Sequence, residues 1–214
     1  MKSGSILFGQ AKGHLQSIRG NQELAKANLP KDIMDMCLIR EDKWLAIACG
    51  LQGGLSILNE KLIVVTSFFK NSSLVAVSYY KESMLLVQHR LLILFDYSKG
   101  EKLCDFNLNS NPFNLIPIAL STCSGRGRVI TNESPQNSAK ECNLFIVQSE
   151  KKVTLLTIEE GATGFDSKVI TISGKRGEWG QGIFVEKKAN EIIISTSERE
   201  GSLRSLLQYK VNIE

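Results

Sequence analysis

Short apolar runs, separated by clusters of glycine, asparagine, serine and lysine, dominate the chain from about residue 32 onward. The runs are enriched in β-branched and aromatic side chains, a composition that is typical of β-strands bounded by turns. Two of them, residues 45–49 and 91–95, are apolar at every position rather than at alternate positions. Strands of that kind are buried on both faces, so the pattern predicts an all-β protein whose sheets cover one another.

The expected strands fall into groups of four. The second strands of the groups begin near residues 44, 84, 143 and 191, at intervals of about 40, 60 and 48 residues. Four-stranded propeller blades recur every 40–45 residues or so, with insertions in loops. The long interval contains residues 123–142, which are polar and rich in turn formers, so we expect a loop insertion there. The expected strands are 34–39, 44–49, 55–58 and 62–68; 74–80, 84–88, 91–97 and 102–108; 115–120, 143–149, 153–158 and 168–172; and 182–186, 191–196 and 203–211.

One segment carries a recognisable motif. Residues 91–103 read Leu-Leu-Ile-Leu-Phe-Asp-Tyr-Ser-Lys-Gly-Glu-Lys-Leu, an apolar strand that ends in Phe95-Asp96 and passes through a turn with Gly100. This segment resembles the third strand, turn and fourth strand of a WD40 repeat, in which the strand ends in Trp-Asp. Phe95 replaces the tryptophan, and the other groups lack both the Trp-Asp pair and the Gly-His dipeptide of the family. The resemblance implies a β-propeller fold and carries no activity.

The predicted fold is therefore an all-β propeller of about four four-stranded blades, either small and closed or open and incomplete. Stacking sheets around an axis covers their faces and leaves only short edges. The fourth group lacks a strand, and residues 5–8 are expected to supply it, whereas residues 21–28 suit a short helix that Pro30 would end. The alternative is an open propeller whose gap a partner fills by strand addition. The expected division is one domain, 1–214, with an N-terminal strand and linker at 1–31 and blades at 32–70, 71–113, 114–174 and 175–214.

Composition narrows the class of protein. The chain is 43% apolar and 22% charged, which is typical of a globular protein. The five cysteines include no Cys-x-x-Cys pair, which favours buried thiols in a reducing compartment. The N-terminal apolar run is shorter than a secretory signal requires, and no stretch has the length of a membrane span. We therefore expect a cytoplasmic or nuclear protein with no membrane partner.

Catalytic chemistry is not indicated by the sequence. His14 and His89 lie in different contexts, and a structural role suits His89 better than that of a general base. No cluster of histidine, cysteine and carboxylate residues has metal-ligand spacing, and no nucleophile, phosphate-binding or dinucleotide-binding motif is present. We expect no enzyme activity, no cofactor and no metal.

The expected function is a non-enzymatic scaffold for protein–protein interactions, and we expect the chain to be a subunit of a multiprotein complex, because propellers present loops on a common face. The segment 174–182 combines a tryptophan with two cations, a composition typical of binding hot spots, although a plain connection between blades also accounts for it. Partners are expected on the loop face or on an open sheet edge near residues 1–30. The candidate contact residues are Lys70, Asn71, Phe113, Lys151, Lys175, Arg176, Trp179 and Arg199.

Two alternative functions remain open at this point. The net charge of +4, the pI of about 8.8 and the pair Arg126 and Arg128 motivate a nucleic-acid-associated propeller. The scattered arrangement of the lysine and arginine doublets favours ordinary solvated surface charge instead. A small-molecule enzyme that uses the central channel is disfavoured, because the sequence shows no set of polar residues that would converge on such a site.

Overall fold

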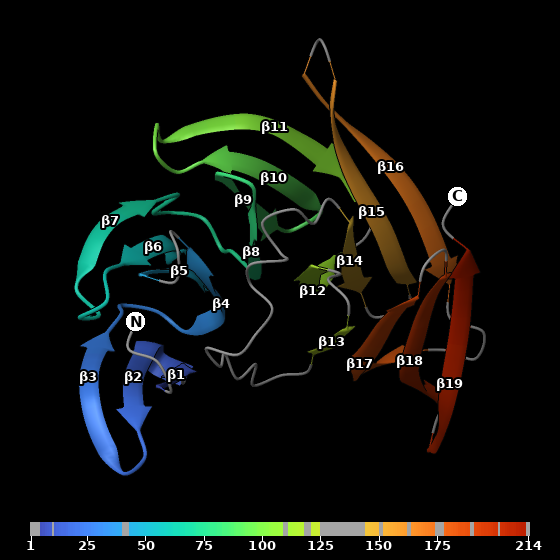
Figure 1. The fold of residues 1–214 in the computed structure, drawn as a ribbon, viewed down its shortest axis with the longest axis horizontal. Coiled ribbons are helices and arrows are strands. Elements are labelled where there is room, and N and C mark those ends of the chain that lie inside the picture. Colours follow the sequence, from blue (N-terminus) through green and yellow to red (C-terminus); the bar gives the residue numbers. More distant parts are fainter. Residues whose placement is uncertain are drawn as a thin grey trace.

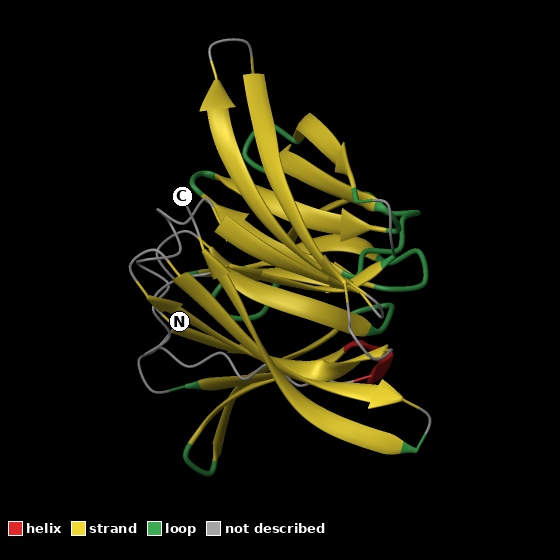
Figure 2. Cartoon of the chain, turned by 90° about the vertical axis from the view of Figure 1, so that its right-hand side faces the viewer, coloured by secondary structure: helices red, strands yellow, loops and turns green. Residues whose placement is uncertain are grey.

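Antiparallel sheets that lie side by side along an arc make up the fold of this computed structural model (Figure 1). The strands pair in five sheets within the described residues, and the short 3-10 turn η1 (Ala11–Gly13) is the helical element among them (Figure 2). The structure describes residues 5–9, 11–39, 43–108, 111–117, 121–124, 144–149, 152–161, 164–173, 178–188, 191–200 and 202–212.

The first sheet contains β1 (Ile6–Gly9), β2 (His14–Arg19) and β3 (Gln22–Asn28). The expected N-terminal strand is therefore present, but it pairs with β2 and does not complete the last sheet. The expected helix over 21–28 is wrong, because these residues form β3. Ala25 and Ala27 pack against the core two residues apart, and this burial on one face of a strand outweighs the helix propensity of the segment.

The second and third sheets are simple meanders in which each strand pairs with the next in sequence. They correspond to the first two expected groups of four strands. The second sheet contains β4 (Ile33–Ile39), β5 (Trp44–Cys49), β6 (Gly54–Leu58) and β7 (Val64–Phe68). The third sheet contains β8 (Ala76–Tyr80), β9 (Ser83–Gln88), β10 (Leu91–Asp96) and β11 (Glu101–Asn107).

The fourth and fifth sheets do not follow sequence order completely, because β13 lies between β12 and β14 in the sequence but belongs to the fifth sheet. The fourth sheet contains β12 (Pro112–Pro117), β14 (Leu144–Ser149), β15 (Lys152–Gly161) and β16 (Gly164–Ser173). The fifth sheet contains β13 (Ser121–Ser124), β17 (Glu178–Lys188), β18 (Glu191–Glu200) and β19 (Leu203–Asn212). The missing strand of the last sheet is thus β13, which follows β12 in sequence and pairs with β17. Of the expected insertion 123–142, the first two residues belong to β13 and the others lie outside the described residues.

The described sheets form an open arc, and the closed ring of four blades is wrong. The first sheet lies at one end of the arc and the fifth at the other, with the ends apart in Figure 1. The described strands of these two sheets do not pair with each other. The open alternative is the arrangement observed.

The core lies in four layers, each between two consecutive sheets. Strand β5 shows how the side chains are sorted. Leu45, Ile47 and Cys49 pack toward the first sheet, whereas Ala46 and Ala48 pack toward the third, and all five are fully buried. Alternate side chains of a strand point to opposite faces, so an apolar run serves two layers at once. This confirms the reason for the near-continuous apolar strands.

Candidate functional site

The turn between β10 and β11 lies in the segment that resembles a WD40 repeat. Asp96 Oδ1 accepts hydrogen bonds from Ser98 Oγ at 2.6 Å, from the Ser98 N–H at 2.9 Å and from the Lys99 N–H at 3.1 Å. The Ser98 hydroxyl, with smaller contributions from these backbone groups, lowers the pKa of the Asp96 carboxyl. Gly100 has a φ of 75° and donates its N–H to the Asp96 carbonyl at 2.8 Å. This carboxylate therefore holds a turn together.

The aromatic residue of the same motif belongs to the core. Phe95 is almost fully buried and makes edge-to-face contacts with Phe68 and Phe69, whose ring centroids lie 4.9 Å and 4.8 Å away. These contacts join the third sheet to the end of β7 in the second sheet. The role of Phe95 is therefore to pack the third sheet against the second.

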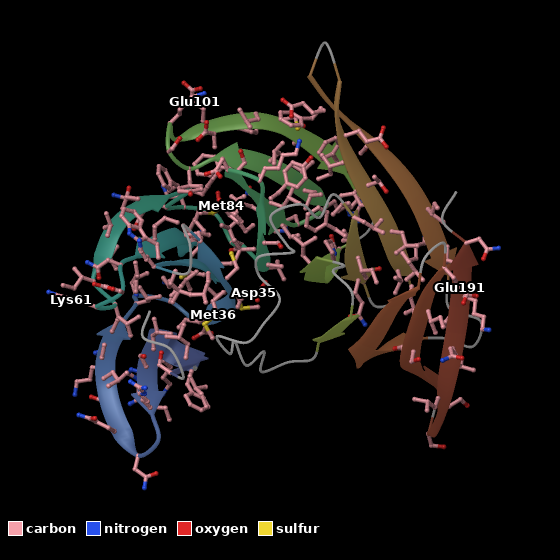
Figure 3. All side chains as sticks on the ribbon, in the orientation of Figure 1. Asp35, Met36, Lys61, Met84, Glu101 and Glu191 are labelled. Carbon is pink, nitrogen blue, oxygen red and sulfur yellow. The ribbon has the colours of Figure 1, made fainter. Side chains whose placement is uncertain are left out.

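Two inner polar side chains also join neighbouring sheets. Asp35 on β4 accepts hydrogen bonds from its neighbour Met36 N–H at 2.9 Å and from Val77 N–H on β8 at 3.0 Å. Figure 3 shows Asp35 and Met36 on the inner side of the arc. Tyr80 donates its hydroxyl to the Ile158 carbonyl at 3.3 Å, between the third and fourth sheets. Both contacts are structural connections across a sheet interface.

The histidines and thiols have surroundings that suit structural roles. His14 and Asn28 lie on paired strands, and His14 Nδ1 is 2.7 Å from Asn28 Oδ1. His89 is exposed in the turn between β9 and β10, with a φ of 50°. Burial raises the pKa of the Cys49 thiol to about 11, so its reactive thiolate form is scarce at neutral pH. Within the described ranges, no group of three histidine, cysteine or acidic residues gathers in a way that could hold a metal ion.

The structure describes some of the candidate contact residues and not others. Lys70 and Asn71 are exposed in the connection from β7 to β8, as a loop contact requires. Phe113 lies in β12. Lys151, Lys175 and Arg176 lie outside the described residues, as do Arg126 and Arg128 of the nucleic-acid hypothesis. The roles of all these residues stay predictions.

Trp179 and Arg199 belong to strands rather than to exposed loops. Trp179 is in β17 and pairs with Glu198 of β18, and the next pair along the ladder joins Glu178 to Arg199. The two residues therefore lie near each other on adjacent strands of the fifth sheet. The glycine-rich composition of 174–182 predicts a loop, but the described part of this segment belongs to β17, which begins at Glu178, and Glu178 and Trp179 pair with β18.

A cleft of about 570 Å³ opens between β11 and the β15–β16 hairpin, and the sequence analysis did not find it. Its apolar lining comes from Phe106, Leu108 and Leu156, and its hydroxyl groups come from Thr154, Ser167 and Thr171. The remaining lining residues are Asp105, Asn107 and Lys152. No motif marks these residues, because they come from two sheets and meet only through the stacking of their outer strands.

No helix in the described part of the chain has the length and apolar character needed to cross a membrane. Neither a protein-family model nor a curated protein sequence matches the chain.

Solved structures share the fold. A chain from the crystal structure of the Mitotic Checkpoint Complex has a TM-score of 0.66 and 10% identity, covering 99% of this chain and 60% of that one. BBS1N, solved in complex with ARL6DN, has a TM-score of 0.60 and 9% identity over 90% of this chain and 58% of its own. The β-propeller domain of Cps50 (Swd1) from Myceliophteria thermophila has a TM-score of 0.63 and 9% identity over 98% of this chain and 69% of its own.

The present chain thus spans about three fifths to two thirds of the length of these structures. At 9–10% identity the likeness concerns the fold. Together with the stacked antiparallel sheets and the turn at Asp96, it shows that the chain has a WD40-like β-propeller fold in an open arrangement.

Proposed function

We propose that this chain is a non-enzymatic scaffold for protein–protein interactions and works as a subunit of a multiprotein complex. The observation that carries the proposal is the open propeller, which exposes turns along its faces and, at its periphery, strand edges that have no neighbouring strand among the described residues. Such surfaces suit protein partners, either through loops or through strand addition. The similar chain from the Mitotic Checkpoint Complex and the complex of BBS1N with ARL6DN support this choice, because both were solved with other proteins.

The arrangement of polar groups also supports a scaffold. Asp35, Asp96 and Tyr80 take part in turns and sheet interfaces, where they position blades. A binding surface made by the remaining exposed turns needs no reacting group, and rigid sheets hold those turns in place. We place the protein in the cytoplasm or nucleus, and we assign the partner contacts to the loop face that contains Lys70 and Asn71.

Affinity purification of the tagged chain from its source cells, followed by identification of bound proteins, tests the proposal. We expect at least one protein to be retained in a fixed ratio. Reversal of the three candidate cations, K175E/R176E/R199E, should reduce its recovery. The control variant K26E/K102E/K210E makes the same change in net charge on the outer strands β3, β11 and β19 and should retain the partner.

Three results would count against the proposal or a part of it. Recovery of the wild-type chain without any stoichiometric protein would refute a scaffold. Equal recovery with both triple variants would remove the candidate cations from the interface. Retention of nucleic acid that disappears as salt rises would favour the nucleic-acid alternative instead.

A further inference from the structure

Each of the five sheets has its last strand in sequence at one end. These outer strands are β3, β7, β11, β16 and β19, and their outer edges have no neighbouring strand in the described part of the chain. Such an edge can pair with another chain, and proteins commonly protect it with charged side chains. Four of the outer strands carry charges, and β7 carries none, since its sequence is Val-Val-Thr-Ser-Phe. The charged residues of the other four are Glu23 and Lys26; Glu101, Lys102 and Asp105; Asp166 and Lys168; and Arg204 and Lys210.

The start of β7 is also unusually apolar for an exposed position. Ile63, Val64 and Val65 follow one another and are 58%, 44% and 47% exposed. All three are β-branched, a class of side chain that favours strand pairing. The segment therefore combines an open edge, high strand propensity and the absence of charge.

Other protective features do not distinguish β7 from its neighbours. A β-bulge interrupts the register between β6 and β7, but β11 has one against β10 as well. At its other end β7 is fixed in place, because Phe68 packs edge-to-face on Phe95. Residues 66–68, which pair with β6 beyond the bulge, are thus held in an extended conformation, and this reduces the entropy cost of pairing with them.

The charges at the two ends of β7 indicate what kind of strand fits. Lys70, just after the strand, is exposed and has no ion-pair partner among the described residues. At the other end Glu60 and Lys61 lie side by side in sequence and cancel in net charge, and Figure 3 shows Lys61 at the outer rim. An antiparallel second copy would place this neutral turn near Lys70, whereas an acidic residue near this end of an added strand would be attracted to the Lys70 ammonium group.

We propose that the β7 edge binds an extended segment of a protein partner by strand addition, with an uncharged β-branched stretch along Val64–Phe68 and an acidic residue beside Lys70. The inference rests on the proposed scaffold function and names a surface for it. It is continuous with the loop contacts, because Lys70 and Asn71 lie in the turn that begins two residues after Phe68, the last residue of β7. Main-chain hydrogen bonds supply affinity in this binding mode, and the flanking charge supplies selectivity.

Three fluorescent nine-residue peptides probe the edge directly. Each has the core Thr-Val-Thr-Val-Thr, flanked on both sides by two glutamates, two serines or two lysines. We expect the wild-type chain to bind them in that order of affinity. Val65→Lys should weaken binding of the glutamate peptide about tenfold, because a charged side chain replaces a half-exposed valine that pairing would cover.

The matched control is Leu103→Lys on β11, an outer-strand leucine of similar exposure at 38%. It should leave the affinity unchanged, and thermal melting verifies that both variants are folded. Lys70→Glu should lower the affinity for the glutamate peptide and raise it for the lysine peptide, by roughly two- to fivefold each. This reversal separates a specific edge contact from general adhesion to apolar surface.

The inference is refuted if the glutamate peptide binds the wild type and the Val65→Lys variant equally, or binds neither. A dimer in light scattering that Val65→Lys dissociates would also overturn it, in favour of a second copy as the occupant. Either result would refute strand addition of a partner at β7 but not the scaffold function, provided that a partner still co-purifies with the wild-type chain. Loss of the partner itself would be a failure of the proposed function.

Discussion

Asp35 offers a direct test of how neighbouring blades are held together. Its carboxylate accepts one hydrogen bond from within β4 and a second, at 3.0 Å, from Val77 N–H on β8. Asp35→Asn preserves the shape of the side chain but supplies only one acceptor oxygen. If that oxygen stays with Met36 N–H, the amide NH₂ faces the Val77 N–H, and two donors meet at a half-buried position.

The expected cost is set by the hydrogen bond across the interface. A hydrogen bond to a charged acceptor contributes about 1.5–3 kcal/mol, and a buried donor left unpaired costs about 1–3 kcal/mol. We therefore expect a loss of about 2 kcal/mol in the free energy of unfolding. With a urea dependence near 2 kcal/mol per molar, the unfolding midpoint should fall by about 1 M.

Urea unfolding followed by circular dichroism measures this shift. Asp105→Asn is the control, because Asp105 is exposed on β11 and forms a surface ion pair with Lys102. Such pairs contribute about 0–1 kcal/mol, so the control midpoint should fall by less than about half as much. Equal midpoints for the two variants would refute the assignment of Asp35 as a connection between blades.

Two further predictions concern the core. Phe95→Ala should destabilise the chain by about 3–5 kcal/mol, more than Leu103→Ala on the surface, as measured by urea unfolding, because it removes a buried ring that contacts Phe68 and Phe69; a cost equal to that of Leu103→Ala would contradict the packing role. The raised pKa of Cys49, about 11 against 9.0, predicts that stability is fully present below pH 9 and falls as the pH rises from 9 toward 11, because the unfolded chain releases the thiol proton first. Cys49→Ala should flatten this alkaline loss in unfolding measured against pH, and an identical pH profile for the variant would contradict it.

Much of the fold was predictable where strands are long, apolar and paired with sequence neighbours. Residues 45–49 and 92–95 illustrate this, since both runs lie in strands and are buried between two sheets. Residues 22–28 were misassigned, because glutamate, leucine, alanine and lysine favour helices and only pairing with β2 makes them a strand. Strand β13 carried no signal, because Ser121–Ser124 is short and polar and owes its place to the ladder with β17.

The sequence indicated which types of residue make up the candidate site, but not whether each residue lies in a loop or in a strand. Lys70 and Asn71 follow an apolar strand in a turn-forming stretch, and the structure exposes both. Trp179 and Arg199 look like loop residues in the sequence, but pairing between β17 and β18 places them in a ladder. The β7 edge could not be identified from the sequence either. The absence of charge on β7 is notable only because the structure shows that the other four outer strands all carry charged residues.

The amino-acid sequence alone predicted buried strands that recur at propeller spacing, because apolar runs and the turn-forming clusters between them are local properties of the chain. The tertiary structure decided which strands pair, how many sheets result and that the described arc is open. Pairing between strands distant in sequence depends on complementary edges and shared burial, and neither is encoded within a single strand. That is why the N-terminal strand was recognised, whereas β13, the strand that completes the last sheet by pairing with β17, was not.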